Sequence, residues 1–88
     1  MFKIKKVEAG DVLITEGTIQ PFIFILKSGK MTVIKSSGRE IKILGEISPG
    51  EFIGEMAHLG SVKEHTASVI AQVDSELVEI ESENFLQV

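Results

Sequence analysis

Short apolar segments recur along this chain at intervals of about ten residues, and most of them end at a turn that contains glycine. Glycine reaches the positive φ values that tight turns between strands require. A chain that alternates short apolar segments with such turns is typical of a β-sandwich or a β-barrel. This pattern limits the fold more than any other feature of the sequence.

The apolar pattern within the segments predicts which of them are strands. Phe2 and Ile4 alternate with Lys3 and Lys5, which indicates a strand with one apolar face. Residues Phe22–Lys27 are almost continuously apolar, which predicts a strand covered on both faces. We therefore expect a mainly β fold, an antiparallel double-sheet jelly roll of about eight short strands. The expected strands are Phe2–Val7, Val12–Thr15, Phe22–Lys27, Lys30–Lys35, Arg39–Ile47, Phe52–Ile53, Thr66–Val73 and Glu76–Glu81. Glu16–Gly17 and Asp74–Ser75 are among the expected turns.

Two short helical pieces are expected beside the strands. One is a turn near residues 55–60. The other is a C-terminal helix that begins at Ser82, which can act as an N-cap, with Glu83 in its first turn. The chain ends six residues after Ser82, so we expect this helix to be truncated. The sequence contains no internal repeat or linker, and we expect residues 1–88 to form a single domain.

The composition excludes several classes of function. A chain of 88 residues has room for one small core. Its net charge of −4, from 9 basic and 13 acidic residues, argues against a nucleic-acid surface. It has no cysteine, and hence neither a disulfide nor a thiolate metal site. No signal peptide is evident, and no apolar run approaches the ~20 residues of a membrane span, so we expect a cytoplasmic protein without a membrane segment.

The segment Gly50–Ala57 contains the most informative chemistry. The short strand Phe52–Ile53 ends at Gly54, and the acid Glu55 follows, with small or apolar residues after it. Backbone N–H groups at such a strand-to-helix turn point the same way and form an anion site. A carboxylate at the mouth of that site can accept hydrogen bonds from a sugar diol. This combination suits a phosphate joined to a ribose.

Several segments together resemble the cyclic nucleotide-binding domain family in their order and spacing. The resemblance covers almost the whole chain and implies a β jelly roll with a phosphate-binding cassette between the sixth and seventh strands. It also implies a non-catalytic regulatory module that requires no cofactor and takes a small-molecule ligand such as cAMP or cGMP. The matching segments are Ala9–Asp11, Glu16–Gly17, Phe24–Gly29, Pro49–Ala57 and Asp74–Leu77.

The resemblance also implies roles for individual residues. Glu55 would hold the ribose 2′-hydroxyl, and the amides of Gly54–Ala57 would face the cyclic phosphate, with Thr66 beside it. Val33 and Leu44 would line the pocket for the base. The complete set of expected ligand-binding residues is Gly54, Glu55, Met56, Ala57, His65, Thr66, Val33 and Leu44.

His65 lies ten residues after Glu55, at the position where the family carries an arginine. An arginine binds phosphate as a charged fork, whereas a histidine offers at most one N–H and only a partial charge at neutral pH. The chain's only arginine, Arg39, is expected on a distant hairpin. Two outcomes stay open at this point. In the first, His65 binds the phosphate as an imidazolium with help from Lys63. In the second, which the charge of Glu64 favours, the pocket no longer takes cyclic nucleotides. It is then empty, takes another small anion or serves only as a scaffold.

Other classes of function were weighed against this one. A structural or interaction module would keep the fold, bind no nucleotide and associate with itself through a sheet edge or through Phe85 and Leu86. Either a homodimer or a longer parent regulatory protein would suit such a module. His58 and His65, seven residues apart, do not match the pattern of jelly-roll metal sites, so we expect no metal. No nucleophile–base arrangement points to an enzyme.

Overall fold

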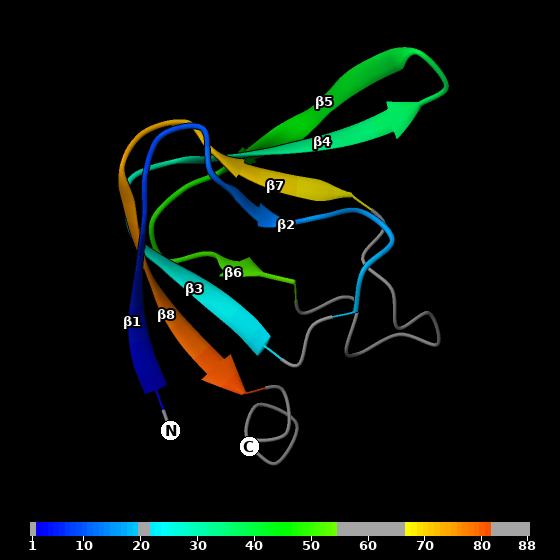
Figure 1. The fold of residues 1–88 in the computed structure, drawn as a ribbon. Coiled ribbons are helices and arrows are strands. Elements are labelled where there is room, and N and C mark those ends of the chain that lie inside the picture. Colours follow the sequence, from blue (N-terminus) through cyan, green and yellow to red (C-terminus); the bar gives the residue numbers. More distant parts are fainter. Residues whose placement is uncertain (1, 20–21, 55–66, 82–88) are drawn as a thin grey trace.

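The protein is described by a computed structural model over residues 2–19, 22–54 and 67–81. Within these ranges eight strands form two four-stranded antiparallel sheets, with the orders β1-β8-β3-β6 (sheet A) and β2-β7-β4-β5 (sheet B), as Figure 1 shows. This confirms the predicted mainly β jelly roll. The helical turn expected near residues 55–60 and the C-terminal helix lie outside the described residues. The strands are β1 Phe2–Val7, β2 Val12–Ile14, β3 Phe22–Ser28, β4 Met31–Ser37, β5 Glu40–Ile47, β6 Phe52–Ile53, β7 Ser68–Ala71 and β8 Ser75–Glu81.

The ends of β7 differ from the prediction. The expected strand Thr66–Val73 is observed as Ser68–Ala71, and Thr66 itself lies outside the described residues. Gln72 lies after the last residue of β7, in the connection toward β8. Its N–H still donates to the carbonyl oxygen of Lys30 at 2.9 Å, in line with the register of β7 and β4. Val73, in the same connection, is 48% exposed.

Ser75 was expected in a turn but is the first residue of β8. It pairs with Val7 of β1 and is only 4% exposed. Its hydroxyl donates to the carbonyl oxygen of Val73 at 2.8 Å and accepts from the N–H of Lys30 at 3.3 Å. Because both hydrogen bonds satisfy a buried hydroxyl, a polar side chain is stable at this interior position.

Four connections cross from one sheet to the other at the same end of the fold, which we call the crossover end. They join β1 to β2, β3 to β4, β5 to β6 and β7 to β8, through residues 8–11, 29–30, 48–51 and 72–74. Figure 1 shows all four as arches on the left side of the molecule. At the opposite end β2 stops at Ile14 and β6 at Ile53, and β3 and β7 begin at Phe22 and Ser68.

Hydrogen bonds tie the crossover connections to one another. The N–H of Ala9 donates to Oδ1 of Asp74 at 2.9 Å, which joins the first connection to the fourth. The N–H of Gly10 donates to the carbonyl oxygen of Ala71 at 2.8 Å. The third connection is tied to β3, since the N–H of Gly50 donates to the carbonyl oxygen of Leu26 at 2.8 Å. The backbone groups exposed by leaving the sheets are thereby satisfied within the crossover end.

The hydrophobic core lies between the sheets and is concentrated toward the crossover end. Met31 is fully buried and pairs with Ile47 on one side and Ala71 on the other, both of them strand residues next to a crossover. At the opposite end of the strands, Phe2 is 69% exposed and Ile41 is 67% exposed. All eight described strands contribute to the core cluster, which contains Val7, Leu13, Ile14, Phe24, Leu26, Met31, Ile47, Ile53, Val69, Ala71 and Leu77.

Strand β3 is covered on both faces near its middle, as its apolar sequence predicts. Ile23 and Phe24 are neighbours, so their side chains point to opposite faces of sheet A. Their exposed fractions are 0% and 2%.

Among the described residues no helix is long and apolar enough to cross a membrane.

Gly29 and Ser75 lie close together at the crossover end. Gly29 has a φ of +101°, and a Cβ atom placed on it would lie 2.1 Å from Oγ and 2.8 Å from Cα of Ser75. These distances are far below van der Waals contact, and one of the atoms is backbone. Glycine is therefore required here both for its conformation and for its lack of a side chain.

A Gly29→Ala substitution is expected to destabilise the fold by about 2–4 kcal/mol, because it adds a steric clash to the cost of a left-handed backbone. Urea unfolding followed by circular dichroism measures this loss. Gly50→Ala is the matched control: its φ is +96°, and no atom lies within 4 Å of the added Cβ. The control should lose only about 1–2 kcal/mol. Equal losses in the two variants would contradict the role assigned to the contact with Ser75.

Candidate functional site

Gly54 marks the point where the predicted anion-binding segment leaves sheet A. It follows β6, whose Ile53 is 2% exposed and pairs with Phe24 of β3. The φ of Gly54 is +88°, a conformation that glycine adopts without the strain that a side chain would cause. The chain therefore turns sharply as it leaves the strand, as the sequence predicted. The residues of the segment that are expected to bind ligand, Glu55, Met56, Ala57, His65 and Thr66, lie outside the described part of the chain.

The same segment returns to the fold in the middle of sheet B. Ser68, the first residue of β7, pairs with Ile34 of β4, and Val69 pairs with Val33. The stretch between Gly54 and Ser68 therefore links an edge of sheet A to a central strand of sheet B. Val33, predicted to line the base pocket, lies one strand away from the point of return.

Val33 and Leu44 lie on adjacent strands in different environments. Val33 is partly buried and packs against the core cluster. It pairs with Gly45, while Ile34 pairs with Ile43, so Leu44 is an extra residue on β5 and forms a β-bulge. Leu44 is 57% exposed. The bulge was not predicted from the sequence, although a glycine inside an apolar strand, here Gly45, is a known signal for one.

Glu16 forms several polar contacts where the segment returns to the fold, and the sequence did not predict this role. Its N–H donates to Oγ of Ser68 at 2.9 Å, and its Oε1 accepts from the N–H of Ser36 at 3.1 Å. Its other carboxylate oxygen lies 4.0 Å from Nζ of Lys35. The described pairing of β7 with β4 stops at Ile34, and the Glu16 carboxylate binds the β4 backbone beyond that point. The sequence indicated only a turn at Glu16, because its partners are distant along the chain.

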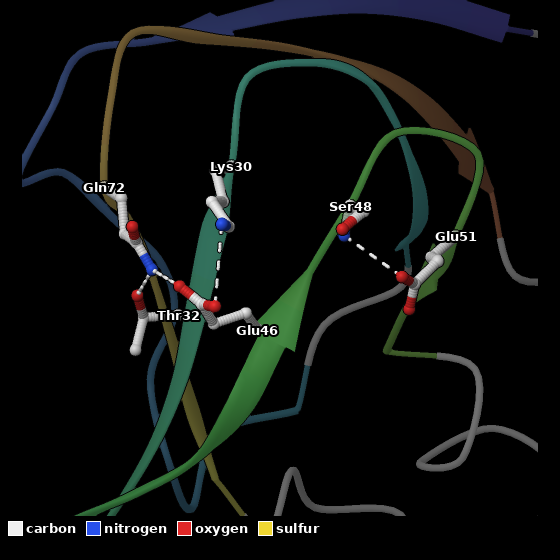
Figure 2. Close-up of polar contacts among 6 residues, drawn as sticks. All are labelled: Lys30, Thr32, Glu46, Ser48, Glu51 and Gln72. Atoms are coloured by element: carbon white, nitrogen blue, oxygen red, sulfur yellow. Dashed lines mark hydrogen bonds and ion pairs between the residues drawn. The ribbon is translucent and has the colours of Figure 1, made fainter.

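A second polar cluster lies at the crossover end (Figure 2). Oε2 of Glu46 accepts a hydrogen bond from Nε2 of Gln72 at 2.6 Å, and Nζ of Lys30 lies 3.5 Å from Oε1 of Glu46. Gln72 also donates to the hydroxyl of Thr32. The hydrogen bond from Gln72, followed by the charge of Lys30, holds the pKa of Glu46 below its ordinary value. In the described ranges no three histidine or carboxylate side chains form a group that suits a metal ion.

The lowered pKa of Glu46 predicts how acid affects this cluster. The folded state favours the ionised carboxylate, so the contribution to stability is present above the unfolded pKa and is lost as pH falls through the folded value. An NMR titration should show the midpoint of Glu46 below the ordinary pKa of a glutamate carboxyl. Gln72→Leu should move the midpoint of Glu46 upward. An unchanged midpoint in that variant would contradict the assigned cause.

The chain is similar to cyclic nucleotide-binding proteins. Residues 4–88 match the family described as the cyclic nucleotide-binding domain. The cGMP-dependent protein kinase of Plasmodium berghei is 32% identical over 88 residues, which cover 99% of this chain and 10% of the kinase. The regulatory domain of Toxoplasma gondii PKA, crystallised with cAMP, has a TM-score of 0.93 at 28% identity over 99% of this chain and 33% of that one.

A bacterial structure shows the same fold. The Thermus thermophilus catabolite activator protein has a TM-score of 0.87 and 28% identity, over 98% of this chain and 40% of that chain. The present chain therefore spans less than half the length of each of these three proteins.

Proposed function

The chain belongs to the cyclic nucleotide-binding domain family, and we propose that it acts as a non-catalytic regulatory module that binds a cyclic nucleotide with an altered phosphate contact. The observation that carries this proposal is the geometry around Gly54. A strand with a buried end residue stops there at a φ of +88°, and the chain returns beside Val33. Both features support an anion-binding segment that starts at Gly54 and faces sheet B.

In the proposed complex, the amides of Gly54, Met56 and Ala57 donate hydrogen bonds to the cyclic phosphate. The carboxylate of Glu55 accepts a hydrogen bond from the ribose 2′-hydroxyl. Converging backbone amides suit a singly charged phosphodiester because they offer directional donors without adding net charge. In a chain whose net charge is −4, such donors offset a general repulsion of anions.

The base would lie against Val33 and Leu44. Val33 offers apolar surface continuous with the core, and the bulge at Leu44 holds a large side chain 57% exposed on the neighbouring strand. A purine face placed there would cover part of the exposed leucine. Apolar contact of this kind is worth about 25 cal/mol per Å² of buried surface, and it does not depend on the charge at position 65.

The charged contact to phosphate falls to His65 in this proposal, with Thr66 beside it. A neutral imidazole donates one hydrogen bond, whereas an imidazolium adds a positive charge. An unperturbed histidine titrates near pH ~6.5, so its charge changes within the physiological range. Losing one charged hydrogen bond of the arginine fork costs roughly 1.5–3 kcal/mol, which corresponds to about tenfold to a hundredfold in affinity.

The first test is binding of cAMP and cGMP at millimolar concentration, measured by thermal shift. Binding raises the melting temperature of the folded chain, because the ligand binds the native state only. We expect a rise of a few degrees for the wild type. His65→Arg should bind about tenfold to a hundredfold more tightly and give a larger rise. His58→Arg is the matched control, because it adds the same charge to the same segment, seven positions before His65 in the sequence.

The outcomes separate the proposal from the other class of function. A response that His65→Arg strengthens and His58→Arg does not supports phosphate recognition at position 65. A response only in the His65→Arg variant means that the pocket is retained and that the wild type has lost useful affinity. If neither nucleotide shifts the His65→Arg variant, the module is structural and the proposed ligand is wrong.

The second test is the pH dependence of affinity, measured by calorimetry between about pH 8 and pH 6. Protonation of His65 adds a charge that attracts the phosphate, so affinity should rise by about tenfold as pH falls across this range. The phosphodiester keeps its single charge throughout. The His65→Arg variant should show a nearly flat profile, because arginine stays protonated. A flat profile in the wild type would exclude binding through an imidazolium.

A further inference from the structure

In the part of the chain that the structure describes, four strands form the edges of the two sheets: β1 and β6 in sheet A, β2 and β5 in sheet B. An edge strand presents backbone donors and acceptors that can pair with another chain. β6 has 2 residues and β2 has 3, too few for stable pairing, whereas β1 has 6 and β5 has 8. Only β1 and β5 are therefore long enough to extend a sheet into a second molecule.

The charges of β1 oppose pairing between two copies of that edge. Lys3, Lys5 and Lys6 fill half of the strand, and it contains no acid. In an antiparallel pair of two β1 strands, lysines face lysines or lie diagonal to them, and like charges at such positions are destabilising. β1 is thus protected against self-association in the manner of many natural edge strands.

β5 differs from β1 in its exposed apolar side chains and in its charges. It carries large exposed apolar side chains, with Ile41 67%, Ile43 72% and Leu44 57% exposed. It also contains both signs of charge, since Glu40 and Lys42 lie on either side of Ile41. Within the described residues β5 pairs only with β4. Figure 1 shows the β4–β5 hairpin extending away from the other strands, so the edge is accessible to another molecule.

We propose that two copies of this chain associate through their β5 edges, in an antiparallel pair with Ile41 of one copy opposite Ile41 of the other. The pairing joins the two copies of sheet B into one continuous sheet. A two-fold axis perpendicular to the sheet passes between the two Ile41 residues, as an isologous interface requires. Glu40 of each copy then lies opposite Lys42 of the other copy.

Charge disfavours two of the registers that the symmetry allows. A pair centred on Lys42 places the two lysines directly opposite each other, and a pair centred on Ile43 places Glu40 opposite Glu46. Registers centred on Ile41 and on Leu44 each give two opposite-charge pairs, which stabilise a sheet. The register centred on Leu44 needs Glu46, which already contacts Lys30 and Gln72.

The bulge supports the same register. Leu44 interrupts the regular geometry of β5, because Val33 pairs with Gly45 and Ile34 with Ile43. Regular backbone for new pairing is therefore found before the bulge, at residues 40–43, and the proposed register uses this stretch. Because only a few residues pair, the interface is smaller than that of stable complexes, and we expect a dissociation constant between about 10 µM and about 1 mM.

The test is sedimentation equilibrium of the 88-residue chain over that concentration range, with charge reversals on β5. Glu40→Lys and Lys42→Glu each turn two attractive pairs into two repulsive ones. Each should weaken dimerisation by about tenfold or more. The double variant Glu40→Lys/Lys42→Glu restores opposite charges in the proposed register, and its affinity should return to near the wild-type value.

Two controls separate this effect from a general change in charge or folding. Lys27→Glu changes the net charge equally, but Lys27 lies on β3 of sheet A, and dimerisation should be unaffected. Lys42 also pairs with Lys35 inside the hairpin, so Lys42→Glu removes a repulsion there. That variant should be at least as stable to urea as the wild type while it dimerises less, which excludes unfolding as the cause.

Several results would overturn the proposal. A wild-type chain that stays monomeric at about 1 mM has no such interface. Dimerisation that is insensitive to both single reversals uses another surface. Failure of the double variant to recover would mean that Glu40 and Lys42 do not face each other across the interface. None of these results bears on nucleotide binding, which the melting temperature measures separately.

Discussion

The contact of Gly29 with Ser75 is the constraint on which the two sheets depend. It joins the connection from β3 to β4 with the first residue of β8, directly after the connection from β7. β3 and β8 are neighbours in sheet A, and β4 and β7 are neighbours in sheet B. One close approach therefore fixes the central strand pair of both sheets at once. Two hydrogen bonds of Lys30 add direction to this contact. Its N–H donates to the Ser75 hydroxyl, and its carbonyl oxygen accepts from the N–H of Gln72.

The core and the polar contacts follow from this arrangement. Met31, Ile47, Ala71 and Leu77 are buried beside the crossovers, where the two sheets are held closest together. Toward the far end of the strands the same residue types become exposed, as Phe2 and Ile43 illustrate. The hairpin of β4 and β5 thus carries apolar residues that the core does not reach. Its charge pattern then decides whether that exposure leads to association.

The sequence predicted the strands well because their signals are local. Alternation in β1, the continuous apolar run in β3 and the glycine turns are all visible within a few residues. The position of Gly54 at the end of β6 was predicted for the same reason. Confirmation of the family and of the jelly roll rests on the spacing of such local segments along the chain.

What the sequence did not reveal depends on partners far apart in the chain. Ser75 was assigned to a turn because serine after aspartate is a turn signal, but its partners Val7 and Lys30 make it a buried strand residue. Glu16 contacts Ser68, 52 positions away, and no local pattern encodes that contact. The bulge at Leu44 has both a local and a distant signal. Gly45 indicates locally that a bulge can occur, but only the pairing of Val33 with Gly45 shows where it lies.

Hydrogen bonds hold the crossover end together, whereas the residues expected to bind ligand come after Gly54 in the chain. Ligand recognition can therefore vary without loss of the fold. The hydrogen bonds of the crossover end join residues 8–11, 26–30, 48–51 and 71–75, and all eight described strands already contribute to the core cluster. The segment expected to contact phosphate starts only after Gly54, at the exit from a two-residue strand. Under the proposed function, a change of charge at position 65 would therefore act on ligand affinity and not on these contacts. A histidine in place of an arginine would then lower affinity, while the strands that position Gly54 and Val33 are kept.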